Sequence, residues 1–259
     1  MKIALLCDYG VDDAAATLYL LKFAERFETV DILPIGGNVP RAVAHDNAKR
    51  LLSNIPCVPD NVRLVDTASL PQPEDFLTDI HGNDGMGDIL PQDHCYVGDE
   101  LHYEDWLDGV DKDYIILSLG PCTVTLDILR RKTVGQLIFM CGNIAMPPNN
   151  GDYEFNHGMD PDAFAACVKY PHVAVTLDTP DCPQCDFNKL KVASDDLFAR
   201  IVARAVTLSN ERHEVDCAIY DLTAAVYVIY PQRFTAQEMT DPFGNVLSVL
   251  KYTSDEPLV

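Results

Sequence analysis

The sequence predicts an α/β protein: a single domain over residues 1–259 with an open, mostly parallel, Rossmann-type sheet flanked by helices. Short apolar runs of strand length alternate with longer segments whose apolar residues recur at helical spacing. The apolar runs end in glycine or polar residues, as strands do where they enter loops. A chain of 259 residues, 47% of them hydrophobic, can bury one large core. Strands that alternate with helices pair in parallel through right-handed crossovers.

The first expected strand covers Ile3–Cys7, and it stops at Asp8. Asp12 and Asp13 follow at the start of a helix that we expect to run from about Asp12 to Phe27. In an open α/β sheet, ligands bind in the crevice outside the carboxyl ends of the strands. Three carboxylates there repel one another unless a cation lies among them, and a hard divalent cation meets that need. Alternatively, Asp12 and Asp13 only favour the positive end of the helix dipole, and Asp8 is a turn residue.

Later elements follow the same alternation. Polar or turn-forming residues stand at four expected strand ends, and we expect them to converge on one edge of the sheet: Asp8, Asn38, Gly120 and Asn143. The expected strands are Val30–Ile35, Val62–Val65, Tyr114–Leu119, Val134–Cys141, Val173–Leu177 and Val246–Tyr252. The expected helices are Pro40–Leu52, a segment after Pro121 that runs through Leu129, one that begins at Asp160-Pro161, and Ser194–Leu208.

Two further segments carry residues suited to a site. The polar stretch Pro71–Asp93 contains three glycines beside His81 and Asp84, which is typical of a loop that folds closely over a ligand or of an ordinary surface loop. Asp221 precedes a nearly continuous apolar run. It is therefore either a helix N-cap or a fourth acid brought into the crevice.

The net charge and the cysteine content indicate which partners and which cellular compartment to expect. A net charge of -21 repels phosphate backbones, so nucleic-acid polymers are poor partners. The apolar start is interrupted at Asp8, and no apolar run is long enough to span a bilayer, which argues against a secretion signal and a membrane partner. Nine cysteines, an odd number, indicate reduced thiols in the cytoplasm. The Cys182/Cys185 pair has no second pair, which favours free thiols over zinc.

The chain from Lys2 to about Pro231 resembles the calcium-dependent nucleoside hydrolases, whose hallmark is an N-terminal D-x-D-P-G-x-D-D turn. The resemblance rests on several blocks in the family's order: Asp8–Asp13, Gly37–Val39, His81–Gly85, Leu119–Pro121, Glu154–Asn156 with Asp160-Pro161, and Asp221. It implies hydrolysis of the N-glycosidic bond of a ribonucleoside, which gives ribose and a free nucleobase. It also implies a nucleoside as the small-molecule partner, a part in nucleoside salvage, and a homodimer or homotetramer.

The resemblance also implies residue roles. Ca²⁺ would be held by Asp8, Asp13, Asp221 and the backbone carbonyl of Leu119, which are hard oxygen ligands. Asp8 would also be the general base that takes a proton from a calcium-bound water. The ribose hydroxyls would be held by side chains from several blocks: Asp12, Asn38, Asn149, Glu154 and Asn156.

The chain departs from the family pattern at several positions. Leu6 and Tyr9 stand where the family turn has Asp and Pro, and Pro148 falls near the place of a usual Asn, beside Asn149. Tyr220 replaces the His that many purine-cleaving members use to protonate the departing base. A tyrosine, with a reference pKa of about 10, is a weaker acid than histidinium. The proton would come from Tyr220, from His81, from a residue in the loop after Cys141, or from water.

Three alternatives follow from these departures. One is a hydrolase for a modified nucleoside such as queuosine, which rests on what Tyr9 and Tyr220 replace. Another is a ribose- or nucleoside-binding protein that has lost catalysis. The third is a metal-dependent phosphohydrolase that uses the Asp8 turn, although Gly10 occupies the place of the second Asp that such enzymes need.

Overall fold

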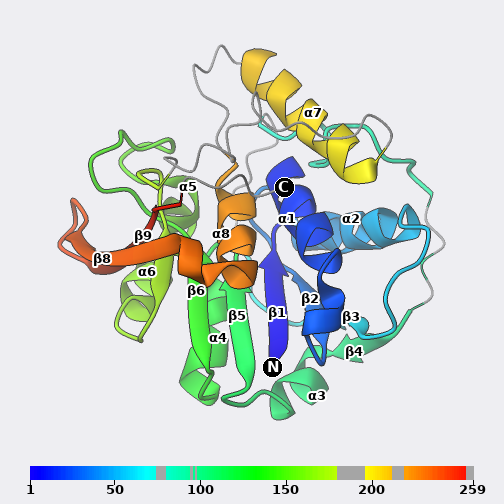
Figure 1. Ribbon diagram of the computed structural model, residues 1–259, viewed down its shortest axis with the longest axis horizontal. Helices are drawn as coiled ribbons and strands as arrows, with labels where there is room; N and C mark the ends of the chain where they lie inside the picture. The colour runs from blue at the N-terminus through cyan, green and yellow to red at the C-terminus, as the bar shows by residue number, and fades with distance from the viewer. Residues whose placement is uncertain (74–79, 94–95, 97, 180–195, 212–218, 255–259) are drawn as a thin grey trace.

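The computed structural model describes residues 1–73, 80–93, 96, 98–179, 196–211 and 219–254. Within this part of the chain, nine strands form one open sheet in the order β4-β3-β2-β1-β5-β6-β7-β9-β8 (Figure 1). All neighbouring strands pair in parallel except β8 and β9. The predicted fold class is therefore confirmed. The strands are β1 (Lys2–Cys7), β2 (Val30–Pro34), β3 (Val62–Asp66), β4 (Glu100–His102), β5 (Tyr114–Ser118), β6 (Gln136–Met140), β7 (Val173–Val175), β8 (Phe234–Thr240) and β9 (Val246–Tyr252).

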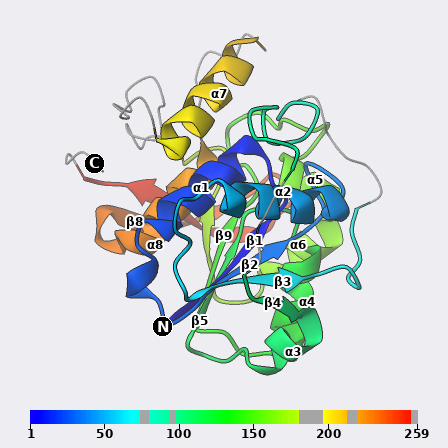
Figure 2. The same ribbon diagram turned by 90° about the vertical axis from the view of Figure 1, so that its right-hand side faces the viewer.

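Helices cover both faces of the sheet (Figure 2). One face packs against α1 (Val11–Leu21), α2 (Arg41–Ser53), α7 (Leu197–Glu211) and α8 (Tyr220–Ile229). The other face packs against α3 (Tyr103–Asp108), α4 (Thr123–Arg131) and α6 (Pro161–Cys167). Alternate residues of β1 enter the two cores, with Leu5 on one side and Leu6 on the other. A strand buried on both faces needs a continuous apolar run, which explains the sequence of β1.

The position of β1 decides where a site can form. It pairs in parallel with both β2 and β5, with Leu6 opposite Leu33 on one side and Ser118 on the other. The N-terminus lies at the lower end of β1 in Figure 1, so these strands end on the upper side. The loops that follow β1, β2, β5 and β6 therefore leave the same edge of the sheet, as predicted for their polar residues.

The first helix is shorter than predicted. It ends at Leu21, and the 3₁₀ turn η1 (Ala24–Arg26) occupies the rest of the expected segment up to Phe27. Tertiary hydrogen bonds explain the difference, because the Glu28 N–H already donates to the Met1 carbonyl beside the sheet. Pairing with the start of β1 thus overrides the helical pattern.

Several short elements were absent from the sequence prediction. β4 and α3 are only three and six residues long, and α5 (Phe155–Met159) has five residues. β8 was missed because it lies at the edge of the sheet, where most of its side chains are exposed, and it pairs with β9 through its backbone. A 3₁₀ turn, η3 (Pro231–Arg233), precedes β8. The predicted helix start at Ser194 and the pair Cys182/Cys185 lie outside the described residues.

The described helices are too short or too polar to cross a lipid bilayer. Free thiols are found at five cysteines of the described part: Cys7, Cys57, Cys122, Cys141 and Cys167.

Candidate functional site

The turn after β1 is closed by an acid from the first turn of α1. Asp13 Oδ2 accepts a hydrogen bond from the Gly10 N–H at 2.7 Å, and Asp13 Oδ1 accepts one from the Asp8 N–H at 3.2 Å. Tyr9, between them, has a positive φ of 45°. Asp13 thus reaches back over the N-terminus of its own helix, and its carboxylate is held in place by the backbone that it caps.

Three acids from two distant segments meet at this turn. Asp12, Asp13 and Asp221 each offer a carboxylate oxygen, and these oxygens lie within 4.8 Å of one another. Asp221 lies in the first turn of α8, whose N-cap is Ile219. The N-cap alternative for Asp221 is therefore wrong, and the alternative of a fourth acid in the crevice holds. Within the described part of the chain, the Asp221 carboxylate receives no hydrogen bond.

Asp8 lies beside this group and is enclosed separately. The Asn38 backbone N–H donates to Asp8 Oδ2 at 2.8 Å, and Asn38 Nδ2 donates to Asp8 Oδ1 at 3.0 Å. Two glycines leave room for the carboxylate. A Cβ at Gly37 would lie 1.9 Å from Asp8 Oδ2, and one at Gly120 would lie 2.9 Å from Asp8 Cγ. The strand ends after β1, β2 and β5 therefore converge on Asp8, as the sequence predicted.

Burial makes these acids difficult to ionise. Above all, burial raises the pKa of Asp8 to about 7, while the Asn38 N–H opposes the rise and the Asp12 charge adds to it. Burial also raises the pKa of Asp13 and of Asp221, and the charges of neighbouring aspartates add to both. Among the described residues, no lysine or arginine pairs with these four acids. Buried carboxylates without a basic partner are suited to a divalent cation.

His81 brings the glycine-rich loop to the same turn. Its Nδ1 accepts a hydrogen bond from the Val11 N–H at 3.3 Å and lies 3.6 Å from Asp12 Oδ1. A Cβ at Gly10 would lie within 3 Å of Asp12, Asn38 and His81 atoms. Three predicted site residues therefore surround Gly10, and the loop that carries His81 folds onto the acidic turn, defined here as residues 8–13.

The Glu154–Asn156 block forms the opposite part of the site. Glu154 is the N-cap of α5, and its carboxylate accepts three backbone N–H groups at 2.7–3.0 Å, including that of Gly142. Asn156 Nδ2 donates to the Leu119 carbonyl at 2.9 Å. Asn156 Oδ1 is buried and has no hydrogen-bond partner among the residues that the structure describes. A carbonyl oxygen has two lone pairs, so Leu119 keeps one for a further ligand.

Three other predicted positions differ in their environment. Asn149 is exposed, and its Oδ1 accepts the Phe155 N–H at 2.8 Å, which stabilises the start of α5. Tyr220 begins α8 directly before Asp221 and is half-buried. Tyr9 is completely buried in the core. Tyr9 therefore does not line an open pocket, and it lends no support to the modified-nucleoside alternative.

The structure also shows hydrogen bonds made by two residues to which the sequence analysis gave no specific contact. Asp178, after β7, accepts three backbone N–H groups of residues 144–146 and so fixes the loop after β6. Asn143 in this loop is 3% exposed, and its Nδ2 donates to the Met146 carbonyl. Its Oδ1 accepts no hydrogen bond from the described part of the chain. Both residues follow predicted strands, so their position in the sequence placed them at the edge of the sheet. Their spacing alone did not show which groups they contact.

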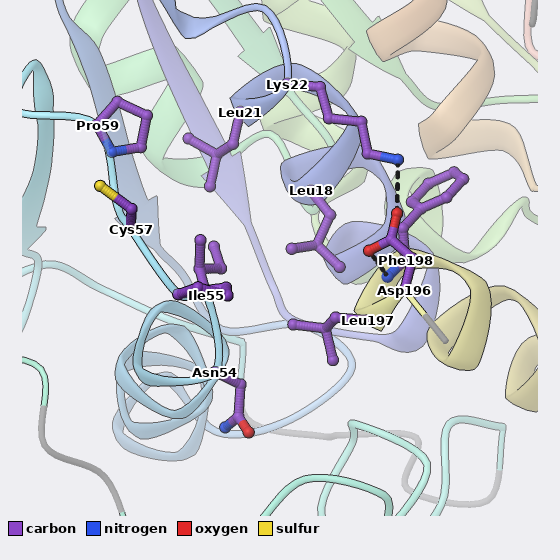
Figure 3. Close-up of a pocket in the computed structure, with 11 residues that line it drawn as sticks. Leu18, Leu21, Lys22, Asn54, Ile55, Cys57, Pro59, Asp196, Leu197 and Phe198 are labelled. Carbon is purple, nitrogen blue, oxygen red and sulfur yellow. Dashed lines mark hydrogen bonds and ion pairs between the residues drawn. The ribbon is translucent and has the colours of Figure 1, made fainter. Parts of the chain in front are cut away.

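A pocket of about 210 Å³ lies at the other end of α1 (Figure 3). It is lined mainly by apolar side chains of α1, the segment after α2 and the start of α7, such as Leu18, Ile55 and Phe198. Lys22 and Asp196 at its rim form an ion pair with 3.0 Å between their charged atoms. None of the acids described above lines this pocket, so it is not the site of their chemistry.

Comparison with known proteins identifies the family of this chain. A protein-family model described as inosine-uridine preferring nucleoside hydrolase matches residues 3–244. No curated protein sequence matches the chain.

Solved structures with similar folds share little sequence with the chain. A purine-preferring ribonucleoside hydrolase from Gardnerella vaginalis has 20% identity and a TM-score of 0.74, over 98% of this chain and 93% of that chain. A plant nucleoside hydrolase has 21% identity and a TM-score of 0.72, over 99% and 89%. An inosine-uridine preferring nucleoside hydrolase from Bacillus anthracis has 14% identity and a TM-score of 0.63, over 99% and 92%. At these identities the likeness shows the fold.

Proposed function

The chain belongs to the inosine-uridine preferring nucleoside hydrolase family, whose members are N-glycosyl hydrolases that act on ribonucleosides, and from this premise we propose how its residues carry out the reaction. The observation that carries the proposal is the gathering of Asp8, Asp12, Asp13 and Asp221 at one sheet edge without a basic partner in the described part of the chain. Such a set of oxygens fits a hard divalent cation, which we propose to be Ca²⁺.

Asp8, Asp13, Asp221 and the Leu119 carbonyl would hold the ion. The distances support Asp13 and Asp221 directly, and the Asn38 hydrogen bonds keep the Asp8 carboxylate beside them. Asp12 belongs to the same group of oxygens, but with 26% of its side chain exposed it is more accessible to a substrate. We therefore assign Asp12 to a ribose hydroxyl. When bound, Ca²⁺ would supply the positive charge that offsets these carboxylates and favours proton loss from a water molecule near neutral pH.

Asp8 is the proposed general base. Its carboxylate is fixed by two hydrogen bonds from Asn38, which keep its oxygens at the sheet edge where the water would be bound. The reaction breaks the bond between ribose C1′ and the base nitrogen and forms a bond from C1′ to the water oxygen. Asp8 takes one water proton, and the base leaves with a proton from His81 or Tyr220.

The ribose is held by hydrogen bonds that orient C1′ toward the water. Asn156 supports this assignment, because its buried Oδ1 lacks a donor that a sugar hydroxyl would supply. We propose the same role for Asp12, Asn38 and Glu154. Asn149 is a weaker member of this set, since its Oδ1 already accepts the Phe155 N–H. Contacts that tighten as the sugar flattens toward an oxocarbenium-like state raise the rate.

Two alternatives differ in substrate or in outcome. A modified nucleoside such as queuosine stays an alternative on the strength of Tyr220, which replaces the usual His beside Asp221. A ribose- or nucleoside-binding protein without turnover is the other, and the presence of all four acids argues against it. The family resemblance also supports a cytoplasmic, homodimeric or homotetrameric enzyme of nucleoside salvage.

A nucleoside panel tests the proposal. Purified protein is incubated with purine, pyrimidine and modified ribonucleosides, with Ca²⁺ or with a chelator, and released ribose is measured. We expect ribose from at least one nucleoside, only when Ca²⁺ is present. Binding of a nucleoside without ribose release would instead favour the inactive alternative.

A further inference from the structure

Helix α7 is connected to the acidic turn by a continuous path of hydrogen bonds. Arg204 Nε donates to the Gly87 carbonyl at 2.8 Å, and the Gly87 N–H donates to the His81 carbonyl at 2.7 Å. His81 Nδ1 in turn accepts the N–H of Val11, the first residue of α1. We propose that Arg204 is a positioning residue for the reaction, which acts by holding His81 against the turn.

Gly87 is the point where the three elements touch. Its φ is +70°, and a Cβ there would lie 2.5 Å from Arg204 Cγ and 3.2 Å from Val11 Cγ1. Only glycine fits this close approach without strain. The loop is therefore packed directly between the side chain of Arg204 and the start of α1.

Arg50 fixes the rest of the loop from the α2 side. Its buried guanidinium donates to Asp84 Oδ2 at 2.7 Å and to the carbonyls of Leu90 and Pro91 at 2.8 Å. Asp84 Oδ1 accepts the Met86 N–H inside the loop. Arg50 thus stabilises the shape of the loop, whereas Arg204 determines how its His81 end meets the turn.

The path sets the orientation of the imidazole. A ring nitrogen that accepts a hydrogen bond carries no proton, so in the neutral ring the proton lies on Nε2. This assignment makes Nε2 the hydrogen-bond donor of the ring, and the proposed reaction needs a donor at the departing base. The inference therefore rests on the proposed function, and it adds α7 to the parts of the chain that control the site.

Arg204→Met tests this role, with Arg200→Met as the matched control. Arg200 lies one turn earlier on α7 and donates to the Ile89 carbonyl of the same loop at 3.3 Å, outside the path to His81. We expect Arg204→Met to lower kcat/KM by about 10- to 100-fold through misplacement of His81. Arg200→Met is expected to leave it near wild type, and Arg204→Lys, which keeps a donor, to recover part of the loss.

A double-mutant cycle separates positioning from general damage. Arg204→Met in the His81→Ala background is expected to cause no further loss, because the residue that it positions is already gone. Additive losses would overturn the proposal, as would equal losses in the Arg200 and Arg204 variants.

Amide hydrogen exchange gives a readout that needs no activity. Arg204→Met is expected to speed exchange at the Gly87 and Val11 amides, while Arg200→Met leaves both protected. Unchanged exchange in Arg204→Met would refute the path even in an enzyme whose substrate is unknown. If the nucleoside panel yields no ribose but the exchange changes as expected, the hydrolase proposal fails and the structural connection stands.

Discussion

At the scale of single residues, the proposed reaction depends on carboxylates whose burial disfavours their charged form. Asp8 and Asp13 are at most 1% exposed, and Asp221 is 3% exposed. Burying several like charges costs free energy that hydrogen bonds from Asn38 and Gly10 offset only in part. The proposed ion and the proposed reaction account for a cluster of carboxylates that is kept at this cost.

Asp8→Asn tests the proposed base. The amide keeps the shape of the carboxylate but cannot take a proton, so we expect kcat to fall by about 10²- to 10⁴-fold. The melting temperature in the absence of Ca²⁺ should change little, because removal of a buried charge offsets the loss of one hydrogen bond that Asn38 donates. Steady-state kinetics and thermal unfolding measure the two effects, with exposed Asp60→Asn as the control. Wild-type turnover in Asp8→Asn would show that another group is the base.

The raised pKa values of Asp8, Asp13 and Asp221 predict a pH dependence of stability. Unfolded aspartates titrate near pH ~4, so between pH ~4 and ~7 the native state binds more protons than the unfolded state. The free energy of unfolding without metal should therefore fall as pH rises through this window. Urea unfolding with a chelator at pH 5 and 7.5 measures it.

Asp221→Asn is the matched variant for this experiment, and it should flatten the fall because one of the penalised charges is gone. A free energy of unfolding that rises across the window would show that these acids are not penalised in the native state. Added Ca²⁺ should stabilise the wild type more at pH 7.5 than at pH 5, since binding requires ionised carboxylates.

At the scale of elements, the site is made by strand ends that meet without side chains in the way. The turn after β2 passes Asp8 so closely that the Cβ of an alanine at position 37 would overlap its carboxylate. The sequence pattern predicted the strand, turn and helix around Asp8. The spacing of apolar residues and a glycine in the turn are local properties of the chain, so they can be recognised without the fold. It overestimated α1 by extending it to Phe27, since the backbone pairing of Glu28 with Met1 is a tertiary effect.

Gly37→Ala tests the requirement for this close approach. The added methyl group must displace Asp8 or the Pro121 ring, which lies 2.7 Å from the same Cβ position. We expect kcat/KM to fall by about 10²-fold with the circular dichroism spectrum unchanged. Gly109→Ala is the control, because a Cβ there would lie 3.4 Å from the Trp106 carbonyl oxygen, an ordinary contact distance. Equal activity in the two variants would show that Asp8 tolerates displacement.

At the scale of the whole molecule, the parallel sheet gathers residues that are far apart in the sequence. Asp8 and Asp13 follow β1, Leu119 follows β5, and Asp221 begins α8. Alternating strands and helices predicted the common edge. They did not predict that Asn149 would accept the Phe155 N–H at the start of α5, because this contact depends on a loop conformation without periodicity.

Calorimetric titration of the metal-free protein with Ca²⁺ tests the central claim most directly. We expect one ion to bind per chain at pH 7.5, and we expect this binding to be lost in Asp221→Asn, whose carboxylate comes from the segment farthest from Asp13 in sequence. A wild-type protein that binds no Ca²⁺, or an Asp221→Asn variant that binds it as tightly as the wild type, would contradict a divalent-ion site at this edge of the sheet.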